Sequence, residues 1–293
     1  MDLVSVIMPA YNAEKHIKAA VDSAINQTYQ NIEVIVINDG STDNTLNILR
    51  QYGNKIKIIN QANKGRAAAN NVGIYNAKGE WIAFLDADDI WIGNKTEKQL
   101  ASCNNYNISH TDCIFFGEKV KKEIKRSEIT KLYSGEVLDK LLVSNFITKS
   151  SVLIRKNLIS EYGCFDESFE CVIDWPLWLK VCANQKLGYL DEPLVKYRVH
   201  SESVSMASKK TLPVHIRILD DAFSPGGIGA AYPELRKSAY LSSYKTNSHY
   251  AAETGDWIFA LSCCFKGLRY NATDSRLWKN IIKCLLIPLG IKY

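Results

Sequence analysis

The chain has 293 residues, of which 46% are hydrophobic and 23% charged, the composition of an ordinary globular protein with a large core. No apolar run approaches the roughly 18 residues that span a bilayer, and no basic segment of a signal peptide precedes the strand-like residues 4–8. We therefore expect a cytoplasmic protein. The eight cysteines contain no Cys-x-x-Cys pair, which favours free core thiols over disulfides or a zinc site.

The net charge of +5 is concentrated in the C-terminal part of the chain. Residues 209–293 carry 12 Lys/Arg and 6 Asp/Glu, whereas residues 1–208 carry 24 and 25. This excess favours an anionic partner such as a membrane surface or a phosphorylated lipid. The chain has no recognised nucleic-acid motif, so nucleic acid is not an expected partner.

The first hundred residues alternate between strand and helix patterns. This order predicts an α/β fold with a mostly parallel sheet and helices on both faces, in which ligands bind beyond the carboxyl ends of the strands. Pro9, Ala10, Tyr11 and Asn12, then Asp39, then residues 86–89 all fall at such ends. The expected strands are residues 4–8 (ended by Pro9), 32–37, 55–59 and 81–85, and the expected helices are 14–26, a segment capped by Ser41-Thr42 that ends near Gly53, and 66–76.

Three carboxylates follow the strand at residues 81–85 within four positions, at Asp86, Asp88 and Asp89. Grouped carboxylates repel one another unless a cation or hydrogen-bond donors offset the repulsion. Mg²⁺ and Mn²⁺ prefer oxygen ligands, and Mg²⁺ commonly links one or two carboxylates to substrate phosphates. The cluster therefore predicts a metal–diphosphate site.

The remaining patterns divide the chain into an α/β domain at residues 1–205 and a helical extension at residues 206–293. The charged segment 119–131 is expected at the surface, and Gly226-Gly227 is expected to break the helical extension. Between them, helices are expected at 135–144 and 174–183, a strand at 151–154, and a strand or hairpin at 187–197.

A last helix is expected near the C-terminus, with Leu277, Trp278, Ile281, Ile282 and Leu285 on one face and basic residues on the other. Two interpretations remain open. The apolar face can pack against the body of the protein, or residues 276–292 can contact a membrane surface, as basic, tryptophan-bearing amphipathic helices do.

Four ordered motifs resemble those of family 2 glycosyltransferases, which have the glycosyltransferase-A fold and are inverting and metal-dependent. They are VSVIMPAYN at residues 4–12, INDGSTD at 37–43, NKG at 63–65 with Asn71 and Gly73, and DADD at 86–89. Weaker matches continue at residues 163–167, 174–179 and 197–200, so the resemblance covers about two-thirds of the chain. It implies a nucleotide half at about residues 1–92 and an acceptor half at about 93–205.

The resemblance implies a nucleotide site lined by Pro9, Ala10, Tyr11 and Asn12. Asp39 resembles the aspartate that accepts a hydrogen bond from the base, usually uracil N3–H, although an Asp-Gly pair is also common in turns.

The resemblance also implies a metal site at Asp88, which would hold Mn²⁺ or Mg²⁺. Asp86 and Ala87 would lie on the nucleotide side, and Asp89 would orient neighbouring groups or cap a helix. His200 aligns with a histidine that completes the metal shell or touches the diphosphate. Arg198 would pair with phosphate or remain a surface charge.

Asp174 aligns with the catalytic base, which removes a proton from the acceptor hydroxyl. The glutamate that precedes this aspartate in the family is here Ile173. The competing candidates for the base are Asp166, Glu167 and Glu170.

One further departure concerns the nucleotide site. The family usually has an arginine immediately before Asn71, where this chain has Asn70. Arg66 lies one helical turn earlier, so we expect it to reach the same region.

We therefore expect an inverting glycosyltransferase that moves a sugar from a nucleotide diphosphate, with UDP the expected nucleotide, onto a hydroxyl of a growing glycan. The acceptor would be carried on a polyprenyl diphosphate lipid during surface-polysaccharide synthesis, with the enzyme at the inner face of the plasma membrane. The alternatives are an enzyme that resembles sugar nucleotidyltransferases and a non-catalytic glycan-binding protein of the same fold.

Overall fold

The computed structural model describes residues 1–201, 203 and 206–287. Within these ranges the chain forms two compact units. The first comprises Met1–Val137 and Phe146–His200, and the second comprises Leu138–Asn145 and the chain from Ser201 onward. The short segment at 138–145 therefore belongs with the helical extension, which the expected division at residue 205 did not anticipate.

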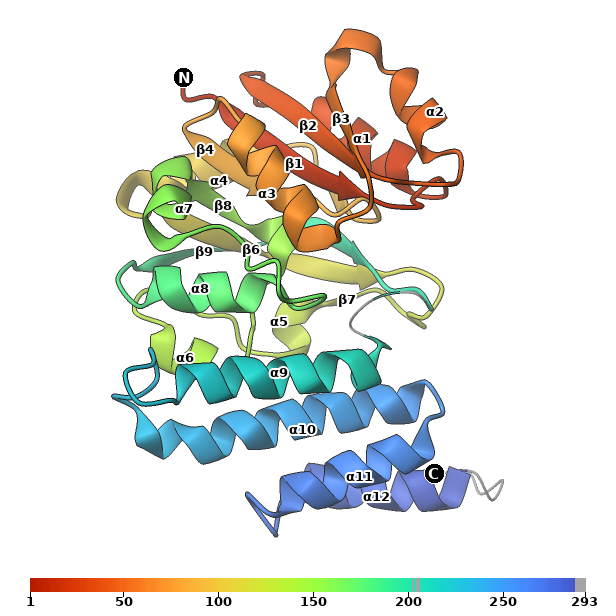
Figure 1. The fold of residues 1–293 in the computed structure, drawn as a ribbon, viewed down its shortest axis with the longest axis vertical. Coiled ribbons are helices and arrows are strands. Elements are labelled where there is room, and N and C mark those ends of the chain that lie inside the picture. The colour runs from red at the N-terminus through yellow and green to blue at the C-terminus, as the bar shows by residue number, and fades with distance from the viewer. Residues whose placement is uncertain (202, 204–205, 288–293) are drawn as a thin grey trace. The chain divides into compact units, whose positions relative to one another are not determined.

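The first unit is built on a nine-stranded sheet in the described residues, in the order β3-β2-β1-β4-β8-β6-β9-β5, with β7 paired to β6 (Figure 1). Strands β1 to β4 pair in parallel, as the sequence predicts, whereas β8 is antiparallel to both β4 and β6. The strands are β1 Val4–Ala10, β2 Ile32–Asp39, β3 Lys57–Gln61, β4 Trp81–Phe84, β5 Ile90–Trp91, β6 Ile108–Phe116, β7 Ile124–Lys125, β8 Leu153–Arg155 and β9 Leu187–Arg198.

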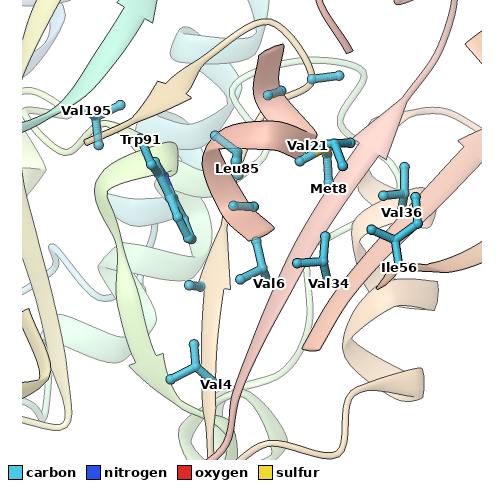
Figure 2. Packing of buried hydrophobic residues seen from close by; sticks show 14 of the residues in the cluster. Val4, Val6, Met8, Val21, Val34, Val36, Ile56, Leu85, Trp91 and Val195 are labelled. Atoms are coloured by element: carbon cyan, nitrogen blue, oxygen red, sulfur yellow. The ribbon is translucent and has the colours of Figure 1, made fainter. Parts of the chain in front are cut away.

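Helices cover both faces of this sheet. On one face α1 and α2 pack against alternate residues of β1 and β2, and Val6, Met8, Val34 and Val36 belong to one core cluster with Val21 of α1 (Figure 2). The helices of this unit are α1 Ile17–Ile25, α2 Thr45–Arg50, α3 Arg66–Asn76, α4 Lys95–Ser102, α5 Arg126–Ile129, α7 Lys156–Tyr162 and α8 Asp174–Cys182, with 3₁₀ turns η1 Gly53–Lys55, η2 Cys103–Asn105 and η3 Lys149–Ser151.

Helix α3 lies against the opposite face, close enough that only glycine fits at residue 73. A Cβ on Gly73 would come within 2.4 Å of Ile7 Cγ2 and 2.8 Å of Ile37 Cδ1. Phe84 of β4 contacts Trp178 of α8 with ring centroids 6.1 Å apart. Because α3 and α8 both pack on the sheet, their residues are held in fixed positions relative to the strand ends.

The first strand does not end at Pro9, as we expected, but continues to Ala10. The carbonyl of Ile7 accepts from Leu85 N on the β4 side, so the nitrogen of Pro9, two residues on, points to the same side. Strand β4 has ended by then, since its pairing with β1 stops at Ile7 and Phe84. The missing N–H of Pro9 therefore costs no hydrogen bond of the ladder.

The second unit is helical and consists of α6 Leu138–Val143, α9 Ser208–Ala222, the turn η5 Pro233–Leu235, α10 Arg236–Glu253, α11 Trp257–Leu268 and α12 Ser275–Leu286 (Figure 1). The expected break at Gly226-Gly227 lies between α9 and α10. Helices α11 and α12 run antiparallel, because Gly267 meets Leu277 while Cys264 meets Asn280. None of the helices in the described residues is long and apolar enough to cross a membrane.

The apolar face expected on the last helix is divided between core and surface. Leu277 and Ile281 are buried against α10 and α11, whereas Trp278, Ile282 and Leu285 are 46%, 44% and 54% exposed. Packing on the helical unit therefore uses two of the five residues of the face and leaves the other three as an exposed apolar strip on α12. Residues 288–292 of the expected membrane contact lie outside the described residues.

Candidate functional site

The carboxyl ends of β1, β2 and β4 meet at one edge of the sheet because the three strands are parallel and adjacent. Asn12, just after β1, has a positive φ of 49°. Its side-chain oxygen accepts from Thr42 N at 2.8 Å, and its backbone N–H donates to Ser41 Oγ at 3.0 Å. Ser41 and Thr42 thus join the β1 and β2 loops, and α2 begins only at Thr45, so the expected helix cap at Ser41-Thr42 is wrong. Tyr11 beside this junction is 52% exposed.

Asp39 is the last residue of β2 and is buried. Its carboxylate accepts hydrogen bonds from Gln61 Nε2 at 2.7 Å, from Lys64 N at 2.9 Å and from Gly65 N at 3.0 Å. Three donors fill most of the roughly four acceptor positions of a carboxylate. Asp39 therefore fixes the loop that leads into α3 and keeps about one acceptor direction for a further donor.

Asp88 and His200 meet although they are 112 residues apart, with Asp88 Oδ2 3.0 Å from His200 Nε2. Burial alone would raise the pKa of Asp88, but the hydrogen bond and charge of His200, aided by Arg66, hold this pKa below its usual value. Arg198 donates from Nε to the Asp88 carbonyl at 2.8 Å while its guanidinium lies over the Phe116 ring. The backbone and the side chain of Asp88 are thus both positioned by the end of β9.

Asp89 anchors the acidic loop to the fold. It is 1% exposed and accepts from Ser150 Oγ at 2.6 Å and from Arg198 N at 2.9 Å. Burial, followed by the charges of Asp88 and Asp86, raises the pKa of Asp89 well above its usual value. These hydrogen bonds join Asp89 to the turn η3 and to the end of β9.

Asp86 contacts a lysine that the sequence did not single out. Lys149 Nζ lies 2.6 Å from Asp86 Oδ1 and 3.5 Å from Asn70 Oδ1. Asn70 also donates to the carbonyl of Arg66 at 2.7 Å. Helix α3 begins at Arg66, as expected, and the charge of Arg66 acts on Asp88. Ala87 between the two aspartates is buried.

Asp174 begins α8 and accepts from Trp178 Nε1 at 3.1 Å. Its neighbours Ile173, Trp175 and Trp178 are buried, whereas Asp174 itself is partly exposed. Two residues earlier Val172 has a φ of +52°, a strained conformation for a β-branched residue that costs about 1–3 kcal/mol. Such strain often accompanies functional sites.

Two of the three competing carboxylates, Glu167 and Asp166, have local structural partners. Glu167 Oε1 accepts from Asn71 Nδ2 at 2.9 Å, and Asn71 also exchanges hydrogen bonds with the backbone of Phe165. Asp166 accepts from Ser168 N at 2.8 Å, and Glu170 is exposed. The contacts of Glu167 and Asp166 hold the segment before α8 in place.

Sequence reasoning missed His16, Lys149 and Ser150. The ring of His16 lies 5.7 Å from that of His200, and burial together with the charges of Arg198 and His200 lowers its pKa. None of these residues belongs to a recognisable motif. They reach the site because α1 and the turn η3 pack beside it, which only the topology reveals.

The donor set suits a metal that is bound together with its substrate. Within the described ranges no group of three or more His, Cys, Asp and Glu side chains forms a complete metal cage. Asp88 and His200 supply one carboxylate and one imidazole, the ligands that Mn²⁺ accepts readily and Mg²⁺ accepts in part. Mg²⁺ sites of this kind take their remaining ligands from water and substrate phosphates.

Known structures of similar fold include two glycosyltransferases. A crystal structure of S. aureus TarS residues 1–349 in complex with UDP-GlcNAc aligns with a TM-score of 0.58 and 18% identity over 99% of this chain and 93% of that one. The mannosyltransferase PcManGT from Pyrobaculum calidifontis, in complex with GDP-Man and Mn²⁺, aligns with a TM-score of 0.64 and 15% identity over 98% and 87%. Both support the glycosyltransferase-A fold.

Sequence comparison gives closer relatives. The Escherichia coli enzyme WfgD, a UDP-Glc:alpha-D-GlcNAc-diphosphoundecaprenol beta-1,3-glucosyltransferase, is 34% identical over 227 residues, which cover 75% of this chain and 86% of WfgD. The chain spans about a third to two-thirds of the length of several other curated relatives it matches. Residues 5–163 match the profile of Glycosyl transferase family 2. Together with the fold, these matches show that the chain belongs to the family 2 glycosyltransferases of the glycosyltransferase-A type.

Proposed function

We propose that this glycosyltransferase moves a sugar, with inversion at the anomeric carbon, from a UDP-linked donor to a hydroxyl of a growing glycan. The observation that carries the proposal is the pairing of Asp88 with His200 at the sheet edge where Asn12 joins the β1 and β2 loops and Asp39 fixes the loop that leads into α3. One edge thus offers a place for a nucleotide and a place for its diphosphate. The UDP-Glc named as the donor of WfgD supports the choice of nucleotide.

The nucleotide would lie along the loops after β1 and β2. Tyr11 presents an exposed aromatic ring on which a base can stack. The remaining acceptor direction of Asp39 would receive the uracil N3–H, which selects a base with a donor at that position. Pro9, Ala10 and Asn12 shape the same wall, while Asp86 accepts from the ribose hydroxyls.

Asp88 and His200 would hold Mn²⁺ or Mg²⁺ against the diphosphate. When bound, the metal neutralises negative charge that develops on the departing nucleoside diphosphate. Arg66, whose charge reaches Asp88, adds to the positive potential on the phosphate side. Asp89 and Arg198 keep the Asp88 loop in position during the reaction.

Asp174 would act as the base. A direct displacement needs a group that removes the acceptor hydroxyl's proton as its oxygen attacks the anomeric carbon. The buried side chains of Ile173, Trp175 and Trp178 lie next to Asp174 in the sequence and on α8. Trp178 fixes the carboxylate by its indole N–H and, through its contact with Phe84, ties α8 to the strand that leads to Asp86.

We propose that the acceptor is carried on a polyprenyl diphosphate lipid, as the name of WfgD indicates for that enzyme, and that the protein works at the inner face of the membrane. The exposed strip of Trp278, Ile282 and Leu285 would insert among lipid headgroups. Residues 257–287 carry five basic residues and one acidic residue. This charge complements an anionic lipid surface.

The direct test is release of UDP from UDP-sugars in the presence of Mn²⁺ and a GlcNAc-diphospholipid acceptor. We expect acceptor-dependent UDP release with at least one UDP-sugar, and inversion of the anomeric configuration by NMR of the product. Pyrophosphate release would instead indicate a nucleotidyltransferase. Absence of turnover with every nucleotide sugar, together with retained glycan binding, would indicate a binding protein.

A further inference from the structure

Lys149 is a nearly buried lysine at the donor edge of the sheet. Its side chain is only 10% exposed, whereas that of its partner Asp86 is 32% exposed. Long cationic side chains normally keep their charged ends in water, because burial of an ammonium costs free energy unless it is paired. Lys149 therefore occupies a position that a surface lysine would not adopt without a compensating interaction.

The turn that carries Lys149 is fixed from several sides. Ser150 accepts from the Asp86 backbone N–H and donates to Asp89, and its carbonyl accepts from Trp91 Nε1. The carbonyl of Ser151 accepts from Gln99 Nε2. These contacts hold η3 against the acidic loop, so the ammonium of Lys149 is positioned before any ligand arrives.

The charges at this edge divide into two pairs. The carboxylate of Asp88 faces His200, at the place of the proposed metal, and the carboxylate of Asp86 faces Lys149. An ammonium has three N–H donors, and the acceptors recorded for it among the described residues are Asp86 and, at the limit of hydrogen bonding, Asn70. At least one donor thus remains for an incoming anion.

We propose that Lys149 is a donor-binding residue whose ammonium contacts an oxygen of the nucleotide diphosphate while it holds Asp86 in place. This inference rests on the proposed function, since it assigns a contact to the same donor. It explains how a site with three carboxylates in four positions accepts a further anion. The alternative is a purely structural role, in which Lys149 only secures the acidic loop.

The test compares UDP with uridine by isothermal titration calorimetry in Mn²⁺. A charge-assisted contact to phosphate predicts that Lys149→Met weakens UDP binding by about 10- to 100-fold and weakens uridine binding, which depends only on the position of Asp86, by much less. It also predicts a shallower dependence of UDP affinity on salt. Lys156→Met is the matched control, because Lys156 at the start of α7 donates to the carbonyl of Ala77 at the end of α3. This variant should change the affinity for neither UDP nor uridine.

A second variant tests the location of the charge. Asn70 Oδ1 is 3.5 Å from the Lys149 ammonium, so Asn70→Arg in the Lys149→Met background should return a cation to the same place and recover most of the UDP affinity. Lys149→Gln, which keeps a hydrogen bond to Asp86, serves if the methionine variant folds poorly. Equal losses for UDP and uridine, or no loss for UDP, would overturn the proposal. Failure of the unsubstituted protein to bind UDP would instead count against the proposed function.

Discussion

Lys95 allows a quantitative test of the buried network beneath the site. It begins α4, is 1% exposed, donates to Gln99 Oε1 at 2.8 Å and lies 4.1 Å from the Trp91 ring. Trp91 and Gln99 in turn hold the carbonyls of η3. Burial lowers the pKa of Lys95 from 10.5 to about 7. The substitution to test is Lys95→Met, which keeps the length of the side chain and removes the charge.

The magnitude follows from the shift in pKa. At about 1.4 kcal/mol per pKa unit, the buried lysine costs about 4 kcal/mol at pH 7 relative to the unfolded chain. The loss of the donor to Gln99 costs about 2 kcal/mol, so Lys95→Met should raise the free energy of unfolding by about 2 kcal/mol at pH 7. Between pH 7 and 10.5 the unfolded chain binds more protons than the folded one, so the stability of the unsubstituted protein rises with pH. At pH 10 the cost of Lys95 falls to about 1 kcal/mol, and the variant should be the less stable protein.

The assay is urea unfolding followed by circular dichroism at pH 7, 8.5 and 10. Lys98→Met is the control, because Lys98 lies on the same helix with its side chain 40% exposed, and its effect should stay within about 0.5 kcal/mol at every pH. A Lys95→Met difference that is destabilising at pH 7, or that does not change with pH, would refute the reasoning.

Three further predictions concern the base, a buried histidine and the helical unit. Asp174→Asn should reduce transfer by about 10²- to 10⁴-fold and leave the UDP Kd within about twofold, whereas a similar loss of UDP affinity would contradict its role as base. Burial lowers the pKa of His110 to about 4, so between pH 6.5 and 4 the unfolded chain binds more protons than the folded one. The free energy of unfolding should therefore fall by about 3 kcal/mol as the pH decreases through this window. His110→Phe should remove this part of the pH dependence in urea unfolding. Ile282→Glu should reduce co-sedimentation with vesicles containing phosphatidylglycerol by at least about tenfold. The control Ile129→Glu, at an isoleucine 61% exposed in the first unit, should not reduce it. Equal vesicle binding by the two variants, or concentration-dependent dimers in analytical ultracentrifugation, would contradict a membrane role.

Local sequence patterns predicted an element correctly where its residues follow a single helical or strand periodicity and where residues that end such an element flank it. Helix α3 has the predicted bounds, because the φ of +87° at Gly65 is not helical and the helix can begin only at the next residue. Strand β2 extends two residues beyond its apolar run, since Asn38 and Asp39 pair with Asn60 and Gln61 of β3. Pairing partners, rather than the residues' own preferences, decide where such a strand ends.

The difference between local sequence patterns and pairing partners also separates the predicted site residues from the missed ones. Asp39, Asp86 and Asp88 were predictable because each lies at the carboxyl end of a strand or just after it in sequence. Lys149 was not, because its place depends on β8 pairing antiparallel to β4, which brings the preceding turn to the Asp86 loop. Contacts that depend on strand order leave no mark in a local motif.

The most direct test of the proposed site is UDP binding with and without Mn²⁺, measured by calorimetry on the unsubstituted protein and on Asp88→Ala. We predict that Mn²⁺ tightens UDP binding by at least about tenfold in the unsubstituted protein, because Asp88 and His200 would hold a metal that offsets the charge of the diphosphate. Asp88→Ala should abolish this gain while uridine affinity stays within about twofold. UDP binding that is unaffected by Mn²⁺, or an Mn²⁺ effect that survives Asp88→Ala, would contradict the assignment of Asp88 and His200 as the metal–diphosphate site.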